Sequence, residues 1–591
     1  MKKLFRALAA TVVALCFASA LTAQKQDWQP VTQDELKMTK GVVDPDADAE
    51  AILWDVYVAD DLNENEYETV LHHYMKVKIF NDRGRENFSK IDIEYGKIPE
   101  LGVNIKIKEI AARTTKADGT TVELSPSDIF DKDVVKGSGF KLKAKSFAVP
   151  GIEAGAVIEY KWTEVRPATL HQRLDMAREI PVESVRYHIS PADVPDMGMR
   201  GQGWNVQNTP FVKEKNGFWM TSASNVAAFK KEPQMPGEYA VRPWLLLFYA
   251  SGAKPPEADK FWKDYAKKQY EEHRNAVKAS DEVKQAAAEA VNGATTDEAK
   301  VQKIFDYVRA HVKNVADDSL GMTADDRKKL KDNKTPSDTL KRGIGTWEDI
   351  DYLFASMVNS VGLEARVVNL PRRSDMPFPK EFTDDFFMRT ENIAVKLGDK
   401  WQYFDPGSKY IPYGMLVWQE EGQPALISDP KEGQWDATPM SSAQRSMELR
   451  SGNFKLLEDG TLEGTVKIEY TGHIAAEVKE YNDDVLPPQR ESALKKLVKE
   501  NVLSTAEISD ISIENMTDPD KPVIYTFKIK VPEYATRTGK RLFFQPDVFE
   551  RSSKPMFATA GRHYDIQFEY PYGENDEITI QLPTGFELES P

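Results

Sequence analysis

The residue pattern of this chain changes character twice, and the changes limit the folds open to it. Residues 45–245 hold runs that alternate apolar and polar side chains, such as residues 72–80 and 103–108, and this period of two is typical of half-buried strands. Residues 257–314 instead space their apolar residues as helices do. Beyond about residue 440 the strand pattern returns, with one helical insertion at 486–503. The sequence therefore predicts a β domain, a mixed helix–sheet domain and a second β domain.

Two helices are predicted with most detail in the middle third. The first starts near Thr295, which would form a capping box with Glu298. Its buried face would carry Val301, Ile304, Phe305, Val308 and Val312. The second runs over residues 347–361 and ends at Gly362. The charged, turn-rich residues 316–342 indicate a long surface connection. Strands are expected at residues 365–370, 392–397, 401–404, 464–470, 523–531 and 565–570.

Residues 1–23 have the pattern of an export signal. Lys2, Lys3 and Arg6 are followed by a short apolar run, residues 7–17, and then by small residues suited to cleavage near Ala20 or Ala23. We therefore expect an exported protein, periplasmic or extracellular. No later stretch reaches 18 uninterrupted apolar residues, so no integral membrane span is expected.

After cleavage the chain would contain no cysteine, because Cys16 is the only one among 591 residues. Disulfides, a thiolate nucleophile and a cysteine–metal site are then excluded. The eight histidines are scattered and form no His-Glu-x-x-His motif, so we expect no metal and no cofactor. The 78 basic and 94 acidic residues give a formal net charge of −16 without a basic block, which argues against a nucleic acid partner.

Three short motifs follow one another in the middle third. They are Gly-Thr-Trp-Glu-Asp at 345–349, Leu-Phe at 353–354, and Gly-Leu-Glu-Ala-Arg-Val-Val at 362–368. In this order they resemble the core of the transglutaminase-like superfamily, which shares its fold and catalytic plan with papain-like cysteine proteases. The resemblance implies a central α+β domain. In that plan a cysteine opens the helix, a histidine lies on a following strand and an aspartate on the next.

The flanking regions extend the resemblance over most of the mature chain. Residues 77–80, 116–119 and 147–160 resemble a domain of unknown function that precedes such cores in exported bacterial proteins, and residues 582–587 resemble that group's terminal β domain. The expected fold is multidomain α+β. It comprises a leader at 1–23, an N-terminal β-sandwich-like domain at 24–250, a transglutaminase-like domain at 251–435 and a C-terminal β-rich domain at 436–591.

The resemblance places unusual residues at the three catalytic positions. Trp347 falls at the cysteine position, and an indole offers one N–H donor but no nucleophile. Thr390, Glu391 or Asn392 falls at the histidine position, and none of them is an imidazole base. Asp405 alone matches its counterpart. The triad is therefore predicted to be degenerate, with no catalytic residue expected and with Trp347 and Asp405 as candidate binding residues.

Each of these residues also has a structural interpretation. Thr346 could act as a hydroxyl nucleophile, but with Asp349 three residues on it is better explained as a helix N-cap. Trp347 could line a retained cleft or fill the vacated site as core. Asp405, standing alone, would more often cap a turn at Pro406 than catalyse.

These observations leave three hypotheses for function. The chain could be an exported, non-catalytic transglutaminase-like protein that binds an envelope protein, a peptide or a glycan. It could be a structural part of an envelope assembly. It could instead be an amide-bond hydrolase or transferase that uses non-cysteine chemistry. Loss of both nucleophile and base favours the first two. The sequence predicts neither the ligand nor the oligomeric state.

Overall fold

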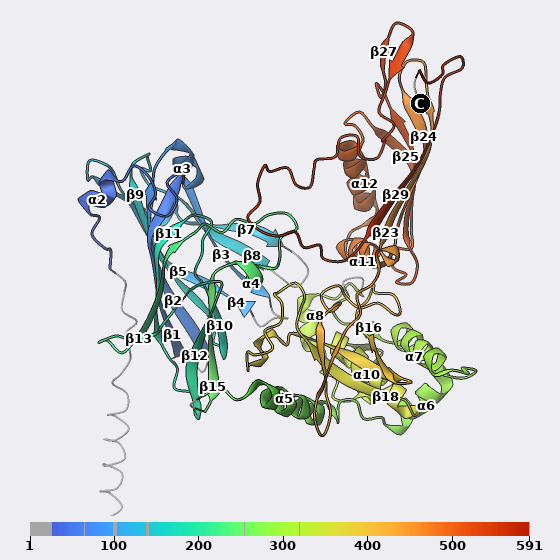
Figure 1. Ribbon diagram of the computed structural model, residues 1–591, viewed down its shortest axis with the longest axis horizontal. Coiled ribbons are helices and arrows are strands. Elements are labelled where there is room, and N and C mark those ends of the chain that lie inside the picture. The colour runs from blue at the N-terminus through green and yellow to red at the C-terminus, as the bar shows by residue number, and fades with distance from the viewer. Residues whose placement is uncertain are drawn as a thin grey trace, which may run out of the picture. The chain divides into compact units, whose positions relative to one another are not determined.

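The computed structural model describes residues 27–589, apart from 64–65, 99–102, 137–140, 208, 253 and 318–319 (Figure 1). The predicted leader, residues 1–23, lies outside the described residues. The chain forms two compact units, one of Met1–Lys231 with Val241–Lys254 and one of Glu232–Ala240 with Pro255–Pro591. It therefore passes between the units three times. This division into two units does not test the limits predicted for the three domains, 24–250, 251–435 and 436–591, which stay predictions.

The first unit is built around an eight-stranded sheet. In spatial order its strands are β13 (Val212–Lys213), β14 (Trp219–Val226), β11 (Val182–Ser190), β1 (Ala49–Asn63), β2 (Glu66–Ile79), β9 (Val157–Pro167), β5 (Lys106–Thr115) and β6 (Thr121–Glu123). β1 and β11 run parallel, whereas β1 and β2 and then β2 and β9 run antiparallel. The predicted turn at residues 117–120 joins β5 to β6, and Gly119 supplies its positive φ of 87°.

Two smaller sheets complete this unit. One has the order β10 (His171–Asp175), β15 (Trp244–Ser251), β12 (Met197–Trp204), and the other β4 (Val103–Asn104), β3 (Lys90–Ile98), β8 (Lys141–Ala148), β7 (Phe130–Lys136). Its helices are α2 (Gln33–Lys37), α3 (Asp82–Asn87) and a 3-10 turn at Pro126–Asp128, while α4 (Glu238–Val241) lies where the chain passes between the units. The N-terminal region is β-rich, as expected.

The second unit opens with helices. They are α5 (Ala258–His273), α6 (Asp281–Ala290), α7 (Asp297–His311), α8 (Ala324–Lys329), α9 (Pro336–Arg342) and α10 (Trp347–Ser360). The predicted apolar face of α7 is confirmed, since all five of its residues are buried. The predicted cap is wrong by one residue, because Thr296 is the N-cap and accepts from the Ala299 amide at 3.1 Å. The predicted surface connection at 316–342 is also wrong, because α8 and α9 form there, each opened by a Thr–Asp capping box.

A five-stranded antiparallel sheet packs against these helices. Its order is β20 (Lys400–Phe404), β19 (Thr390–Leu397), β18 (Glu364–Leu370), β21 (Pro424–Ile427), β22 (Gln434–Ala437). Alternate side chains enter two cores, as period two requires. Val367, Ile393 and Val395 pack with α6, α7 and α10, whereas Val368 and Ala394 pack on the opposite face. A short parallel pair, β16 (Lys313–Asn314) and β17 (Ile344–Gly345), leads into α10.

The last part of the second unit is a second five-stranded sheet. Its order is β25 (Glu507–Glu514), β26 (Val523–Val531), β24 (Leu462–Tyr470), β23 (Met447–Leu456), β29 (Gly573–Gln581), with β23 and β29 parallel. The remaining elements are α11 (Gly472–Tyr481), α12 (Pro487–Asn501), the pair β27 (Thr536–Thr538) and β28 (Arg541–Phe543), and 3-10 turns at Asp385–Phe387 and Ala443–Arg445. The strand predicted at 565–570 is wrong: these residues lie outside every sheet, and β29 begins only at Gly573.

The architecture is multidomain α+β, which confirms the predicted fold class. No helix in the described part of the chain combines the length and the apolar character needed to span a membrane.

Candidate functional site

Trp347 lies at the first position of α10, where the family resemblance places a cysteine. The preceding residue caps the helix: Thr346 Oγ1 accepts from the Asp349 amide at 3.2 Å, and Asp349 Oδ2 accepts from the Thr346 amide at 3.0 Å. This reciprocal pair is a capping box, so the capping interpretation of Thr346 is confirmed. The Trp347 side chain is half-buried. It is therefore neither sealed in the core nor fully presented to solvent.

The loop after β20 packs directly on the start of α10. A Cβ added to Gly407 would lie 2.5 Å from the carbonyl oxygen of Trp347, so only glycine fits there. The Gly407 amide also donates to Asp351 Oδ1 at 2.8 Å, and Asn314 Nδ2 donates to the Gly407 carbonyl at 3.1 Å. These contacts bring the Asp405 loop beside Trp347 across almost 60 residues of sequence.

The strand register decides which residue lies opposite Asp405. Phe404 of β20 pairs with Ile393 of β19, and the next step of this antiparallel ladder sets Asp405 against Asn392. Thr390 and Asn392 share one face of β19, since side chains alternate, and Glu391 points to the other face, where it accepts from the Tyr352 hydroxyl at 3.0 Å. Of the three residues left open by the sequence, Asn392 is thus the one whose register on β19 extends toward Asp405.

Asn392 and Asp405 are both buried, yet each bonds to a different neighbour. Asp405 Oδ1 accepts from the Ser408 amide at 3.1 Å, and the Ser408 hydroxyl donates to Oδ2. Asn392 Nδ2 donates to Glu420 Oε2 at 2.9 Å. No hydrogen bond joins Asn392 to Asp405 among the interactions of the described residues. The predicted capping role of Asp405 is confirmed for the turn at 405–408.

Glu420 is a member of this site that sequence analysis missed. It is 2% exposed and accepts from the Thr390 hydroxyl at 2.5 Å as well as from Asn392. Burial and the nearby charge of Asp405 raise the pKa of Glu420 to about 8, against the two hydrogen bonds that favour its ionised form. Glu420 is therefore mostly protonated at neutral pH.

Asp351 is the second missed residue. It lies one helical turn after Trp347 on the same face of α10 and is 2% exposed. Burial, followed by the charge of Asp405, raises the pKa of Asp351 well above its ordinary value, and burial likewise raises the pKa of Asp405. A carboxylate among the apolar residues Ile350, Leu353 and Phe354 was the sequence signal for it. For Glu420 the chain offered no such signal.

The arrangement is a buried acidic cluster of Asp351, Asp405 and Glu420, in which Asn392 and Thr390 both donate to Glu420. It holds carboxyl groups, an amide and a hydroxyl, but neither a thiol nor an imidazole. The carboxyl oxygens of these three residues do not form one of the convergent ligand groups found among the described residues, in which the ligand atoms lie within 4.8 Å of one another. The cluster is thus a hydrogen-bonded support beneath the start of α10.

Fold and site together define a multidomain protein with a papain-like α+β core between β-rich regions. Residues 284–406 match the transglutaminase-like superfamily. Residues 65–230 match a domain of unknown function, DUF3857, and residues 540–591 match another, DUF3858. The family resemblance inferred from the sequence is therefore confirmed: the chain carries a transglutaminase-like core flanked by these two domains.

Several solved structures resemble the chain at low sequence identity. A protein from Parabacteroides distasonis ATCC 8503, provisionally assigned as a protease, is 14% identical over 85% of this chain and 95% of its own, with a TM-score of 0.42. A transglutaminase is 15% identical over 40% of this chain and 53% of its own, with a TM-score of 0.17. A provisionally assigned cysteine protease from Cytophaga hutchinsonii is 11% identical over 54% and 75%, with a TM-score of 0.16. No curated protein matches the sequence.

Proposed function

We propose that this chain is an exported transglutaminase-like protein that has lost cysteine chemistry and acts as a binding or scaffold module in the cell envelope. One observation carries the proposal. Asn392 and Asp405 each adjoin the last pair of β19 and β20, Ile393 with Phe404, yet Asn392 is held by Glu420 and Asp405 by Ser408. In a working triad the residue at the histidine position links the aspartate to the nucleophile. Among the described residues, Asn392 makes no hydrogen bond to Asp405, and Trp347 offers it no nucleophile to activate.

The chemistry of the remaining groups supports the same conclusion. Thr346 Oγ1 accepts from the Asp349 amide at 3.2 Å, so one of its two lone pairs is engaged in the helix cap. A hydroxyl also needs an adjacent general base to attack an amide. The buried carboxyls described above, Asp351 and Glu420, are each 2% exposed, and neither is hydrogen-bonded to Thr346 among the described residues. The alternative of an amide-bond hydrolase or transferase with non-cysteine chemistry therefore has no observation in its favour.

Export is part of the proposal and is supported by the basic, apolar and small-residue pattern of residues 1–23. Mass spectrometry of the native protein tests it. We expect a mature N-terminus just after Ala20 or Ala23, and an intact Met1 in the native protein would contradict export.

The experiment that tests the loss of catalysis measures amine incorporation into glutamine peptides and hydrolysis of peptides by the mature chain. We expect no turnover by the unaltered protein and none by Trp347→Cys, because no imidazole lies opposite Asp405. Turnover by the unaltered protein that disappears in Thr346→Val would show that the hydroxyl is a nucleophile. Ser337→Ala, which removes a half-buried hydroxyl from the first turn of α9, is the matched control.

A further inference from the structure

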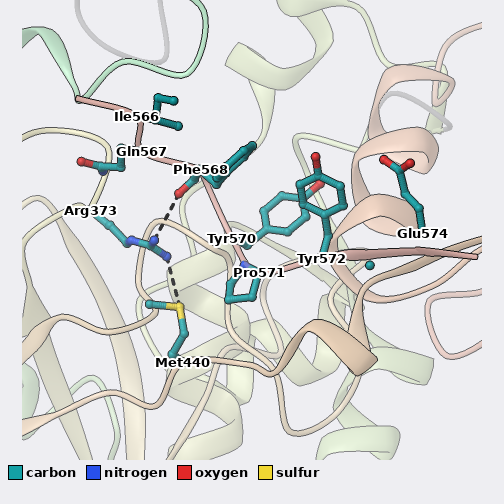
Figure 2. Close-up of a pocket in the computed structure, with 10 residues that line it drawn as sticks. Arg373, Met440, Ile566, Gln567, Phe568, Tyr570, Pro571, Tyr572 and Glu574 are labelled. Atoms are coloured by element: carbon teal, nitrogen blue, oxygen red, sulfur yellow. Dashed lines mark hydrogen bonds between the residues drawn. The ribbon is translucent and has the colours of Figure 1, made fainter. Parts of the chain in front are cut away.

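An open groove of about 740 Å³ in the second unit is lined by charged groups of both signs (Figure 2). At one end Arg373 donates to the Phe568 carbonyl at 3.2 Å. At the other end Glu574 shares the cation of Arg450 with three further carboxylates. The groove therefore selects no class of ligand by its charge. A more specific set of charges lies in the first unit, on the eight-stranded sheet.

His188 of β11 has a carboxylate at each of its two ring nitrogens. Asp55 Oδ1 of β1 lies 2.9 Å from Nε2, and Glu214 Oε2 lies 2.8 Å from Nδ1. Both His188 and Asp55 are buried. A neutral imidazole has one N–H and can donate to only one of the two carboxylates, whereas the imidazolium donates to both. The geometry therefore favours the doubly protonated ring.

The other groups that face His188 come from four strands of the same sheet. Tyr57 of β1 pairs with His188, and its ring stacks on the imidazole with 4.3 Å between the ring centroids. Arg186 lies two residues before His188 on β11 and therefore on the same face. His72 of β2 is the partner of Tyr57, and Met220 of β14, the partner of His188, is uncharged. The two carboxylates are thus the charged groups in hydrogen-bond contact with the imidazole ring.

Glu214 belongs to the hairpin that forms one edge of this sheet. It follows β13, which pairs with β14 through only two residue pairs and has both of its residues exposed. The Glu214 amide donates to the Phe218 carbonyl at 2.8 Å and so closes the turn of the hairpin. The main chain of β13 therefore makes few contacts of its own, and the Glu214 side chain anchors this edge to β11 through His188.

We propose that Asp55, His188 and Glu214 form a proton-dependent latch, which closes the hairpin at residues 212–218 when His188 is an imidazolium and releases it when His188 is neutral. A neutral ring presents the lone pair of one nitrogen to a carboxylate, which removes a hydrogen bond and adds repulsion. The Glu214 side chain is 26% exposed and that of Asp55 only 7%. The proton therefore leaves Nδ1 for solvent, and the contact with Glu214 is the one that opens. The latch lies in the first unit and does not rest on the function proposed for the core.

The direction of the pH dependence follows from His188. Burial lowers the pKa of His188, but hydrogen bonds to Asp55 and Glu214 and their charges outweigh burial and raise the pKa above its ordinary 6.5. The stabilisation of the closed hairpin is thus fully present below pH 6.5 and is lost as the pH rises through the raised pKa. Between these two values the equilibrium constant for opening should increase about tenfold per pH unit.

Two measurements by mass spectrometry on the mature full-length chain test the latch. Deuteration of the C2 position of each histidine, followed against pH, reports the pKa of each imidazole separately. We expect the pKa of His188 above 6.5 and that of His72, which burial lowers, below 6.5. Amide exchange of residues 212–220, corrected for the intrinsic pH dependence of exchange, reports the opening of the hairpin. We expect the hairpin to open more as the pH rises.

Glu214→Gln should lower the pKa of His188 and make the opening of the hairpin independent of pH, because an amide can accept from an imidazolium and donate to a neutral ring. Glu179→Gln is the matched control, since it removes an exposed carboxylate three residues before β11 and should change neither quantity.

A pKa of His188 below 6.5 would place the shared proton on a carboxyl group and overturn the proposal. So would hairpin opening in the unaltered protein that does not depend on pH, or equal effects of Glu214→Gln and Glu179→Gln. If Glu214→Gln opens the hairpin at every pH, the pH dependence measured on the unaltered chain still decides.

Discussion

Replacing Glu420 by glutamine should stabilise the transglutaminase-like core, and increasingly so as the pH rises. Glutamine has the same shape, and its Oε1 can still accept from Asn392 Nδ2 while its Nε2 donates to the Thr390 hydroxyl. The change therefore keeps both contacts, which measure 2.9 Å and 2.5 Å with glutamate, and removes only the titratable proton.

The expected size follows from the pKa of Glu420. It rises from the ordinary 4.5 to about 8 in the folded chain, through burial and the charge of Asp405. Between these two values the folded chain retains a proton that the unfolded chain has released, so stability falls as pH increases. At 1.36 kcal/mol per pH unit, the full loss above pH 8 is at most about 5 kcal/mol. Glu420→Gln should be near neutral at pH 5 and stabilising by a few kcal/mol at pH 9.

Hydrogen exchange of the amides in β18 and β19, compared between the two proteins at each pH, measures this difference for the core alone. The neighbouring Glu421 is a control of opposite sign. Burial raises its pKa, but hydrogen bonds from His473 and Ser441 outweigh burial and lower it. Ionised Glu421 thus stabilises the folded chain at pH values above its pKa in the unfolded chain, and this stabilisation is lost as the pH falls. Glu421→Gln should therefore destabilise the protein at pH 7 and destabilise it less at pH 4. A pH-independent effect of Glu420→Gln would refute the assignment of a protonated carboxyl.

Three other substitutions test the packing and charge described above. Gly407→Ala should lower the free energy of unfolding by about 1–3 kcal/mol, because its methyl group would meet the Trp347 carbonyl at 2.5 Å. The control Gly561→Ala adds a methyl group in open space and should cost little. Equal losses in thermal unfolding would contradict the packing of Gly407 on Trp347. Thr346→Val should lose about 1 kcal/mol through the helix cap, and an unchanged melting temperature would argue against the cap. Arg450→Met should destabilise the protein, because four carboxylates lose the cation that they share: Glu448, Glu550, Glu574 and Asp576. Salt screens the repulsion among these carboxylates, so the loss of stability should be smaller in high salt. A loss that does not depend on salt would indicate packing as its cause.

The elements that sequence analysis predicted best are those with strong periodicity. The apolar face of α7 and the helix that begins at Trp347 and stops before Gly362 were predicted because core-facing residues repeat regularly and the caps are local. The prediction for residues 316–342 was wrong because their helices lack such periodicity. α8 and α9 have only six and seven residues, too few for a periodic pattern to stand out from their charged composition.

The candidate site was predictable only in part. Motif order led to Trp347 and Asp405, but the choice among Thr390, Glu391 and Asn392 needed the strand register, which a single sequence does not fix. Glu420 reaches the site from a turn beyond β20, almost 30 residues after Asn392, and its role depends on tertiary contact alone. Residues 565–570 were predicted as a strand because their side chains alternate, although no strand pairs with them in the structure.

The three passages of the chain between its units have a consequence for the order in which the protein can fold. The Glu232 carboxylate accepts from the His563 amide at 2.8 Å across 331 positions of sequence. The Gln234 carbonyl likewise accepts from the Gln567 amide at 2.7 Å. At 5–20 residues per second, a ribosome would need about 15–70 seconds to synthesise the partner of Glu232. The second unit therefore stays incomplete until almost the last residue is made. An expression fragment that starts at Pro255 would lack this early segment altogether, so a fragment starting at Glu232 is the better choice for separate study.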